Sequence, residues 1–440
     1  MDILNTFSLD CNKKLKLNFN GGELSSDAGM FLLGEFAHKI HLEKIISDYF
    51  KTNDSTVRKH TDTQNALQKI YQCIAGYFQD DVSDDLKTDP VFTALLNKKS
   101  LASQPTLSRF FNRCDDICLM QFELIQQELR RMIYSIKKPE QILIDIDSTL
   151  FSAYGAQEGK SFNAHYREQG FHPLLAYDGL TGDLLKAQLR PGSAYTSKGA
   201  HTFLKPLLLE FLHDYPEIPI YLRGDSGFAD VILYETLESN GVSYTIRLKE
   251  NGKLRKLAYD IEDKLSEQTK ENQIDYAVCY GEFMYKADSW LYPRRVVCKI
   301  EKPENQMIYL YTFLVTNMDG IPQDLVRFYC KRGSMENFIK ESKSGFHMDA
   351  MSSTNMIVNE NKLQLSMLAY NLFNWFRRLV LPKAFQKLRV DTIRLKLLKT
   401  AAKAVHSARY ITFKLCSSCP YKEIFAKTLN NIQRLSPQLN

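Results

Sequence analysis

Residues 329–343 read Tyr-Cys-Lys-Arg-Gly-Ser-Met-Glu-Asn-Phe-Ile-Lys-Glu-Ser-Lys. Tyr329, Arg332, Glu336 and Lys343 follow the spacing Tyr-x2-Arg-x3-Glu-x6-Lys. On an α-helix that advances about 100° per residue, they would share a stripe roughly 60° wide. A carboxylate among cations suits a site where the carboxylate holds a metal ion and the cations hold phosphate oxygens. A solvated helix face with ion pairs between successive turns is the simpler alternative.

Two acidic motifs lie upstream, and each follows a strand-like run. In Gln-Ile-Leu-Ile-Asp-Ile-Asp-Ser-Thr, Asp147 follows the alternating residues Ile142, Ile144 and Ile146. In Ile-Pro-Ile-Tyr-Leu-Arg-Gly-Asp-Ser-Gly-Phe, Asp225 occupies the same kind of position. The sequence therefore predicts carboxylates at the ends of two strands. A turn role in Gly-Asp-Ser-Gly is the alternative for Asp225, because Asp is common in turns.

Asp145 competes with Asp147 for the role at the first strand. Residues two apart on a strand project to the same side, so both carboxylates would face the same site. Asp145 is either a residue that contacts the metal ligands without binding the metal, or a polar residue whose hydrogen bonds are satisfied within the fold.

The combination of motifs resembles bacterial insertion-sequence transposases of the DDE type, in the IS-four-like group and its 1380 branch. The resemblance covers roughly residues 140–380 and includes Ser-Phe-Asn-Ala-His-Tyr-Arg-Glu-Gln-Gly-Phe-His-Pro-Leu-Leu-Ala at 161–176. It implies that Asp147, Asp225 and Glu336 are the catalytic residues and the metal ligands, and it favours Asp147 over Asp145. The metal that the resemblance implies is Mg²⁺, for which Mn²⁺ can substitute. A pair of such ions held by carboxylates promotes phosphodiester cleavage and strand transfer.

The resemblance also implies contacts with double-stranded DNA, both the inverted-repeat ends of the element and the target, by a homodimer in the synaptic complex. Trp290, one of two tryptophans, is a candidate platform for an unstacked base. Its alternative role is to pack the surrounding sheet, since tryptophans are usually buried. The predicted DNA-binding residues are Tyr329, Arg332, Lys343, Trp290, Arg294 and Arg295.

The pattern along the chain predicts an α/β protein built around a ribonuclease-H-like catalytic core. The core takes residues 136–249 and 321–350, and a strand-rich insertion takes residues 250–320. A helical region at 1–135, which the resemblance associates with DNA ends and dimer contacts, precedes the core. A basic helical region at 351–440 follows it. Within the first region, one helix is expected to begin after Gln104-Pro105-Thr106 and to run through Phe122.

Composition excludes a membrane protein and favours a partner that is a polyanion. No apolar run approaches the about 18 residues of a membrane span, so we expect a cytoplasmic protein that joins the nucleoid when it binds DNA. Residues 377–440 contain 14 Lys or Arg and two acids, a charge of 14 − 2 = +12 against +6 for the whole chain. Such a segment suits nucleic acid, although a solubilising surface would have the same composition.

Nine cysteines, an odd number, fit a reducing compartment rather than a disulfide framework. Cys416 and Cys419 form a CxxC without a second ligand pair, so packing thiols are the simpler interpretation than zinc.

The sequence thus predicts a DDE transposase that acts by cut-and-paste transposition of an insertion sequence. Two rivals remain: a transposase-derived DNA-binding protein without catalysis, and a metal nuclease that shares the ribonuclease-H-like core.

Overall fold

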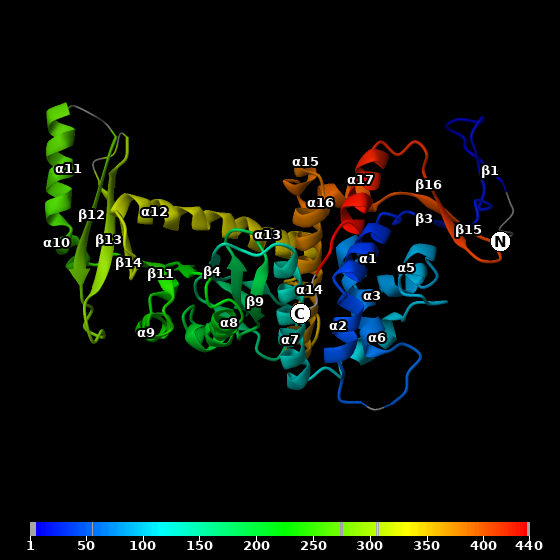
Figure 1. The fold of residues 1–440 in the computed structure, drawn as a ribbon, viewed down its shortest axis with the longest axis horizontal. Coiled ribbons are helices and arrows are strands. Elements are labelled where there is room, and N and C mark those ends of the chain that lie inside the picture. Colours follow the sequence, from blue (N-terminus) through cyan, green and yellow to red (C-terminus); the bar gives the residue numbers. More distant parts are fainter. Residues whose placement is uncertain (1–5, 55, 273–275, 305, 307, 438–440) are drawn as a thin grey trace. The chain divides into compact units, whose positions relative to one another are not determined.

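The computed structural model describes residues 6–54, 56–272, 276–304, 306 and 308–437. The chain divides into two compact units (Figure 1). The helical unit comprises Met1–Ile136, Lys343–His347 and Gln364–Asn440, and the sheet unit comprises Lys137–Ser342 and Met348–Leu363. The sheet unit includes most residues of the predicted core and insertion, but Lys343–His347 of the predicted core belong to the helical unit. The predicted domain bounds stay predictions.

The sheet unit is built on an eight-stranded sheet in the order β12-β13-β14-β11-β10-β4-β8-β9. β10 pairs in parallel with β4 and with β11, whereas the other neighbours are antiparallel. The strands are β4 (Ile142–Ser148), β8 (Leu174–Asp178), β9 (Leu184–Gln188), β10 (Ile220–Gly224), β11 (Ser243–Leu248), β12 (Ala277–Tyr285), β13 (Arg294–Lys302) and β14 (Leu310–Thr316). The predicted α/β class is confirmed, and the structure adds that the fold has a large central sheet.

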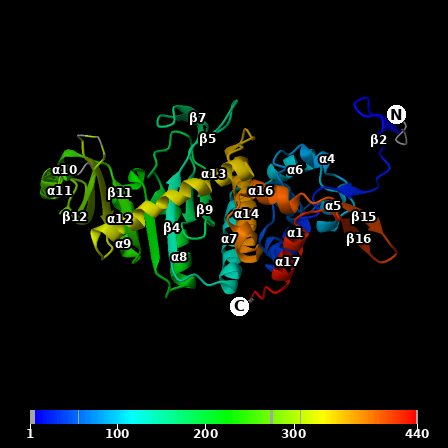
Figure 2. The same ribbon diagram turned by 90° about the horizontal axis from the view of Figure 1, so that it is seen from above.

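Helices cover the sheet, and the central strands are buried on both faces, as parallel strands under helices usually are. In Figures 1 and 2, α12 runs along one side of the sheet, opposite α8 and α9. A small sheet of β5 (Phe151–Ser152), β7 (Glu168–Phe171) and β6 (Ser161–Asn163) lies between β4 and β8 in sequence. The helices that begin in this unit are α8 (Ala200–Asp214), η1 (Ser226–Phe228), α9 (Val231–Ser239), α10 (Gly252–Leu257), α11 (Tyr259–Asn272), α12 (Pro322–Cys330), η2 (Lys331–Gly333), α13 (Ser334–Phe346) and α14 (Met356–Val380).

The predicted strand-rich insertion extends the central sheet instead of forming a sheet of its own. β14 pairs with β11 in the register Thr316↔Thr245 and Phe313↔Leu248. β13 and β12 then continue the sheet outward. Without these three strands, the edge of β11 away from β10 would be unpaired, and an unpaired strand edge is a template for further pairing.

The stretch 329–343 does not form a single helix, so the prediction of one continuous stripe was wrong. α12 ends at Cys330, a 3₁₀ turn takes Lys331–Gly333, and α13 begins at Ser334. A 3₁₀ turn rotates about 120° per residue instead of about 100°, which shifts the side chains after it out of the stripe. Gly333 sits at this junction, consistent with its low helix propensity.

The helical unit combines the two ends of the chain. β15 pairs with β3 in the register Ala402↔Ser25, and Lys39 Nζ donates to the carbonyl oxygen of Gln433 at 3.2 Å. Its elements are β1 (Phe7–Ser8), β2 (Lys16–Leu17), β3 (Leu24–Ser25), α1 (Met30–Lys39), α2 (Leu42–Tyr49), α3 (Asp62–Ala75), α4 (Val82–Asp85), α5 (Pro90–Leu95), α6 (Gln104–Phe111), α7 (Asp116–Ile136), α15 (Lys383–Gln386), α16 (Val390–Ile393), η3 (Arg394–Leu398), β15 (Ala402–His406), β16 (Ile411–Leu415) and α17 (Lys422–Gln433).

Two expectations for this unit need correction. The helix expected to begin after Gln104-Pro105-Thr106 and to run through Phe122 is interrupted between α6 and α7. There, Asp115 accepts a hydrogen bond from the backbone N–H of Cys118 at 3.1 Å and starts a new helix. The basic tail is not wholly helical, because β15 and β16 form an antiparallel hairpin. Phe413 of this hairpin packs on Phe31 with ring centroids 4.6 Å apart, so tertiary packing favours the strand.

No helix in the described ranges is both long and apolar enough to cross a membrane.

Candidate catalytic carboxylate site

Neighbouring parallel strands bring Asp147 and Asp225 together. Arg223 of β10 pairs with Asp145 of β4, and Gly224 pairs with Ile146. Asp147 and Asp225 are the next residues along these two strands, and parallel strands end on the same edge of a sheet. The two carboxylates that the sequence predicted at strand ends are therefore neighbours.

Asp147 is held by an arginine from the turn after α12. Its Oδ2 lies 2.9 Å from Arg332 Nη2, and its Oδ1 accepts from the backbone N–H of Ser148 at 2.8 Å. Arg332 Nη2 also donates to the carbonyl oxygen of Ile146 at 3.0 Å. Arg332 therefore fixes the end of β4 and supplies positive charge to its carboxylate.

The protonation of Asp147 reflects burial and a second negative charge. Burial raises the pKa of Asp147 to about 6, the Arg332 charge opposes this, and the Asp225 charge adds to it. Two adjacent carboxylates in a partly buried site repel each other, so a cation between them would be stabilised.

Asp225 also serves as the turn residue that the alternative interpretation described. Its Oδ1 accepts from the backbone N–H of Gly227 at 2.9 Å and so caps the short helix η1. Among the described residues none donates to its Oδ2. One oxygen of Asp225 shapes the turn, and the other remains available.

Asp145 is fully buried and paired with Arg223, a residue that sequence reasoning did not single out. Arg223 Nε and Nη2 donate to the two carboxylate oxygens at 2.6 and 2.7 Å, and Nη1 donates to the carbonyl oxygen of Phe328 at 2.6 Å. Burial raises the pKa of Asp145, and Arg223 opposes the shift. A Cβ at Gly179 would lie 2.5 Å from Asp145 Oδ2, so glycine is needed beside this pair. Asp145 is thus a polar residue satisfied within the fold.

Glu336 is exposed in the first turn of α13 and does not join the aspartate pair. Within the described residues, no three His, Cys, Asp or Glu side chains form a group that could hold a metal ion. α13 nevertheless docks on the sheet, because Tyr177 shares a hydrogen bond of 2.7 Å with Ser342 and packs on Phe338. The structure brings together two of the three predicted ligands.

Tyr329 and Lys343 have different surroundings. Tyr329 packs at the edge of a buried cluster that includes Leu325 and Val326 of α12. Burial raises its pKa, and the charge of Arg332 is the largest influence that opposes this shift. Lys343 belongs to the helical unit. Their contacts with DNA stay predictions.

Tyr166 is a further candidate beside the aspartates. Its Oη lies 3.5 Å from the carbonyl oxygen of Ser148. Burial, with the negative charges of Asp147 and Asp225, raises its pKa. Its ring contacts the ring of His172, whose Nδ1 lies 2.8 Å from the carbonyl oxygen of Ala194. The segment 161–176 contained the signal, but nothing in the sequence separated Tyr166 from its neighbours.

Trp290 is 7% exposed and packs edge-on against Tyr234 and Tyr285 at 5.5 and 5.3 Å. Arg294 lies over its ring and forms a two-point ion pair with Glu238 at 2.7 and 2.9 Å. This is the arrangement that the packing alternative predicts.

Arg295 pairs with Glu282 and donates from Nη1 to the carbonyl oxygen of Met318 at 2.5 Å. The DNA contacts assigned to Trp290, Arg294 and Arg295 stay predictions.

The donor chemistry of the site fits a hard divalent cation in part. Asp147 and Asp225 offer the carboxylate oxygens that such cations prefer. The guanidinium of Arg332 lies against Asp147, and its Nε is buried without a described hydrogen-bond partner. The site therefore combines two candidate metal ligands, Asp147 and Asp225, with the guanidinium of Arg332. Glu336 would be the third ligand of the predicted set.

Comparison with known proteins identifies the chain by family. The family model for the transposase DDE domain, group 1, matches residues 7–437. No curated protein matches the chain.

Solved structures provide weaker likenesses. A piggyBac transposase synaptic complex with hairpin DNA is similar at 11% identity and a TM-score of 0.46, over 94% of this chain and 83% of that chain. A Mos1 transposase paired-end complex with the left transposon end is similar at 14% identity and a TM-score of 0.18, over 46% and 64% of the two chains. At these TM-scores the likenesses establish no shared fold, and the family match stands on its own. The chain therefore belongs to the transposase DDE domain group 1 family.

Proposed function

We propose that this protein is a DDE transposase that excises and inserts an insertion sequence by cut-and-paste transposition. The observation that carries the proposal is the pair of carboxylates, Asp147 and Asp225, at the ends of neighbouring parallel strands. The pair occurs in a chain whose family match extends over residues 7–437. Its substrates would be the terminal inverted repeats and the target DNA, brought together by a homodimer in the cytoplasm.

The strand order supports a ribonuclease-H-like core as part of this proposal. β9, β8 and β4 are antiparallel neighbours, and β10 and β11 follow in parallel through α8 and α9. The element order is therefore three strands, a helix, a strand, a helix and a strand, apart from the small sheet of β5–β7. The strands β12–β14 are then an insertion before the helix that carries Glu336.

Asp147, Asp225 and Glu336 would hold Mg²⁺, which when bound activates the attacking oxygen and stabilises the leaving oxygen of a phosphodiester. Arg332 orients Asp147 and balances its charge. The buried Nε of Arg332 has no partner among the described residues, and it would donate to a phosphate oxygen once the site opens to admit the substrate. Tyr166 lies beside the pair, and we expect its hydroxyl to contact the substrate.

Glu336 provides the test of this proposal. We expect Glu336→Gln to abolish Mg²⁺- or Mn²⁺-dependent nicking of duplexes that carry the inverted repeats flanking the reading frame. Binding of the same duplexes should be retained, since most binding energy comes from phosphate contacts elsewhere. Glu267→Gln, at an exposed glutamate on α11, is the matched control and should cleave normally.

A non-catalytic DNA-binding protein is the second candidate, and one observation favours it. Glu336 is exposed and outside the aspartate pair. If the native protein binds its ends but cleaves them with neither metal ion, the second candidate holds. Cleavage by Glu336→Gln at the native rate would instead remove Glu336 from the site and leave the enzyme in place.

A further inference from the structure

The helical unit contains a basic pocket that is independent of the carboxylate site. Its volume is about 430 Å³, and it lies between residues 57–60, the start of α3, the segment around Ser100 and the start of α6. No carboxylate occurs among its described lining residues. Its charged and titratable lining residues are Arg58, Lys59, His60, Lys87, Arg109 and Arg113.

Two of these cations are neutralised by neighbouring carboxylates. Arg58 pairs with Asp54, and Arg113 Nη2 lies 2.8 Å from Asp62 Oδ1. Arg113 also donates from Nε to the hydroxyl of Thr52 at 3.3 Å. These two arginines therefore build the wall of the pocket, and their charge is largely balanced.

The other cations have no carboxylate partner among the described residues. Lys87 and Arg109 are exposed at the rim, and neither side chain takes part in a described hydrogen bond. Lys59 Nζ reaches only the hydroxyl of Ser100 at 3.4 Å. Lys98 Nζ, just behind, donates to the carbonyl oxygen of Lys59 at 2.8 Å. The pocket thus concentrates positive charge that the fold does not compensate.

Neighbouring groups respond to this concentration of charge. Burial, with the charges of Lys98 and Lys59, lowers the pKa of His60. Burial and Lys59 likewise lower the pKa of Lys98. Mutual repulsion among cations is unfavourable, and an anion in the pocket would relieve it.

Uncharged donors also line the pocket. The hydroxyls of Ser103 and Thr106, at the start of α6, lie 3.1 Å apart. Asn65 is 1% exposed, and its Oδ1 has no described partner. Its Nδ2 donates to the carbonyl oxygen of His60 at 3.5 Å, so the donors that this part of the lining offers an anion are the two hydroxyls. Cations and neutral donors around a cavity of this size suit the oxygens of a phosphate group.

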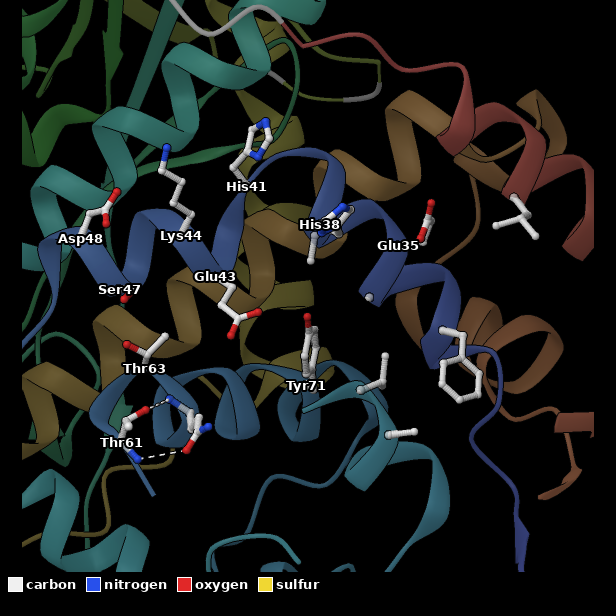
Figure 3. A pocket seen from close by; sticks show the side chains of 17 residues that line it. Glu35, His38, His41, Glu43, Lys44, Ser47, Asp48, Thr61, Thr63 and Tyr71 are labelled. Carbon is white, nitrogen blue, oxygen red and sulfur yellow. Dashed lines mark hydrogen bonds between the residues drawn. The ribbon is translucent and has the colours of Figure 1, made fainter. Parts of the chain in front are cut away.

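A second pocket in the same unit has a mainly acidic lining, in contrast to the basic pocket. It has a volume of about 860 Å³, and its lining includes Glu35, Glu43 and Asp48 against the single ammonium of Lys44 (Figure 3). Both pockets border the start of α3, with Thr61 lining the acidic one. The unit is therefore not uniformly basic, and a polyanion would be directed to one side of α3.

We infer that the basic pocket binds a phosphate of the DNA backbone and anchors duplex DNA on the helical unit. The identity of the polyanion rests on the proposed function, whereas the anion site rests on the pocket itself. Contacts of this kind carry no base specificity, so the pocket positions DNA without selecting its sequence.

Salt dependence of DNA binding tests the inference on the full-length protein. Affinity for a duplex of unrelated sequence is measured by fluorescence anisotropy in EDTA at several salt concentrations. Each lost phosphate contact should flatten the slope of log K against log salt by about 0.9, so the double variant Lys87→Gln/Arg109→Gln, which removes the contact with that one phosphate, should flatten it by about 0.9. By the same relation the affinity falls about eightfold per contact at 0.1 M salt.

The control is Lys44→Gln, an exposed lysine that lines the acidic pocket. It should leave the slope unchanged, and all proteins should show the same melting temperature. If the double variant keeps the native slope and affinity, the inference is overturned. It is also overturned if inorganic phosphate binds in the pocket at low concentration while duplex affinity does not depend on Lys87 and Arg109.

The result is separable from the proposed function, because EDTA removes any metal-dependent reaction. Loss of duplex binding in the double variant supports the pocket even if the native protein cleaves no DNA. Conversely, normal cleavage with an unchanged salt slope would overturn the pocket and leave the enzyme assignment intact.

Discussion

Asp145 and Asp147 lie two residues apart on β4, and each pairs with an arginine. The two pairs differ in how deeply they are buried and in how many of their carboxylate oxygens the arginine binds. In the Asp145–Arg223 pair, both carboxylate oxygens are bonded and the side chains are 0% and 1% exposed. In the Asp147–Arg332 pair, one contact of 2.9 Å joins side chains that are 17% and 13% exposed. The first pair has almost no capacity for another ligand, whereas the second can still accept one.

The difference separates a structural role from a chemical one on the same strand. Arg223 comes from the neighbouring strand and also binds the α12 backbone, so its pair links the sheet to its covering helix. Arg332 comes from a 3₁₀ turn and retains a buried Nε without a described partner. The Asp145–Arg223 pair is buried, and both carboxylate oxygens are hydrogen-bonded, which is typical of a structural role. The Asp147–Arg332 pair retains a buried donor without a described partner, which suits a role in chemistry.

Asp147→Asn should produce the largest effect and should act on chemistry alone. We expect cleavage of transposon-end duplexes to fall by at least about 1000-fold, because a metal ligand supplies several kcal/mol of transition-state stabilisation. The free energy of unfolding should not decrease, since the amide removes a buried negative charge. The two measurements are single-turnover cleavage and denaturant unfolding, and a large loss of stability would contradict the comparison.

Asp145→Asn should mainly lower the free energy of unfolding, in contrast to Asp147→Asn, which should act on cleavage alone. Removing one partner of a buried pair leaves Arg223 uncompensated, which costs about 3–5 kcal/mol of unfolding free energy. Urea unfolding followed by circular dichroism measures this loss. The double variant Asp145→Leu/Arg223→Met should recover most of it, because apolar replacements leave no unpaired charge. Equal stability of Asp145→Asn and the native protein would show that the pair is not structural.

The pH dependence of stability gives a smaller effect. The pKa of Asp147 is raised from 3.8 to about 6, so folding favours its protonated form. The stabilisation of the folded state that results from this preference is complete below pH 3.8 and is lost as the pH rises through about 6. It amounts to at most about 3 kcal/mol, since each pKa unit corresponds to about 1.4 kcal/mol.

The difference in unfolding free energy between the native protein and Asp147→Asn, measured in EDTA, isolates this term. The native protein should lose stability relative to the variant between about pH 4 and pH 6. A constant difference across this window would mean that Asp147 titrates normally.

Much of the fold followed from local pattern. The alternation of Ile142, Ile144 and Ile146 predicted β4, and the strands of residues 277–316 were expected from their content of Tyr, Val and Ile. The break at 331–333 was missed, because a 3₁₀ turn and an α-helix present almost the same local sequence. The tail hairpin was missed for a different reason: its strands are stabilised by pairing with β3 and by packing on Phe31, which are far away in sequence.

The sequence by itself determined that Asp147 and Asp225 end two strands, because strand periodicity and turn residues are local properties. Only the tertiary structure decided that these strands are parallel neighbours and that Asp145 is closed by Arg223. It also decided that Trp290 packs against Tyr234 and Tyr285 and that the cations around α3 and α6 converge on one pocket. These features depend on which distant segments meet, and contact across the sequence is set by the packing of the whole chain.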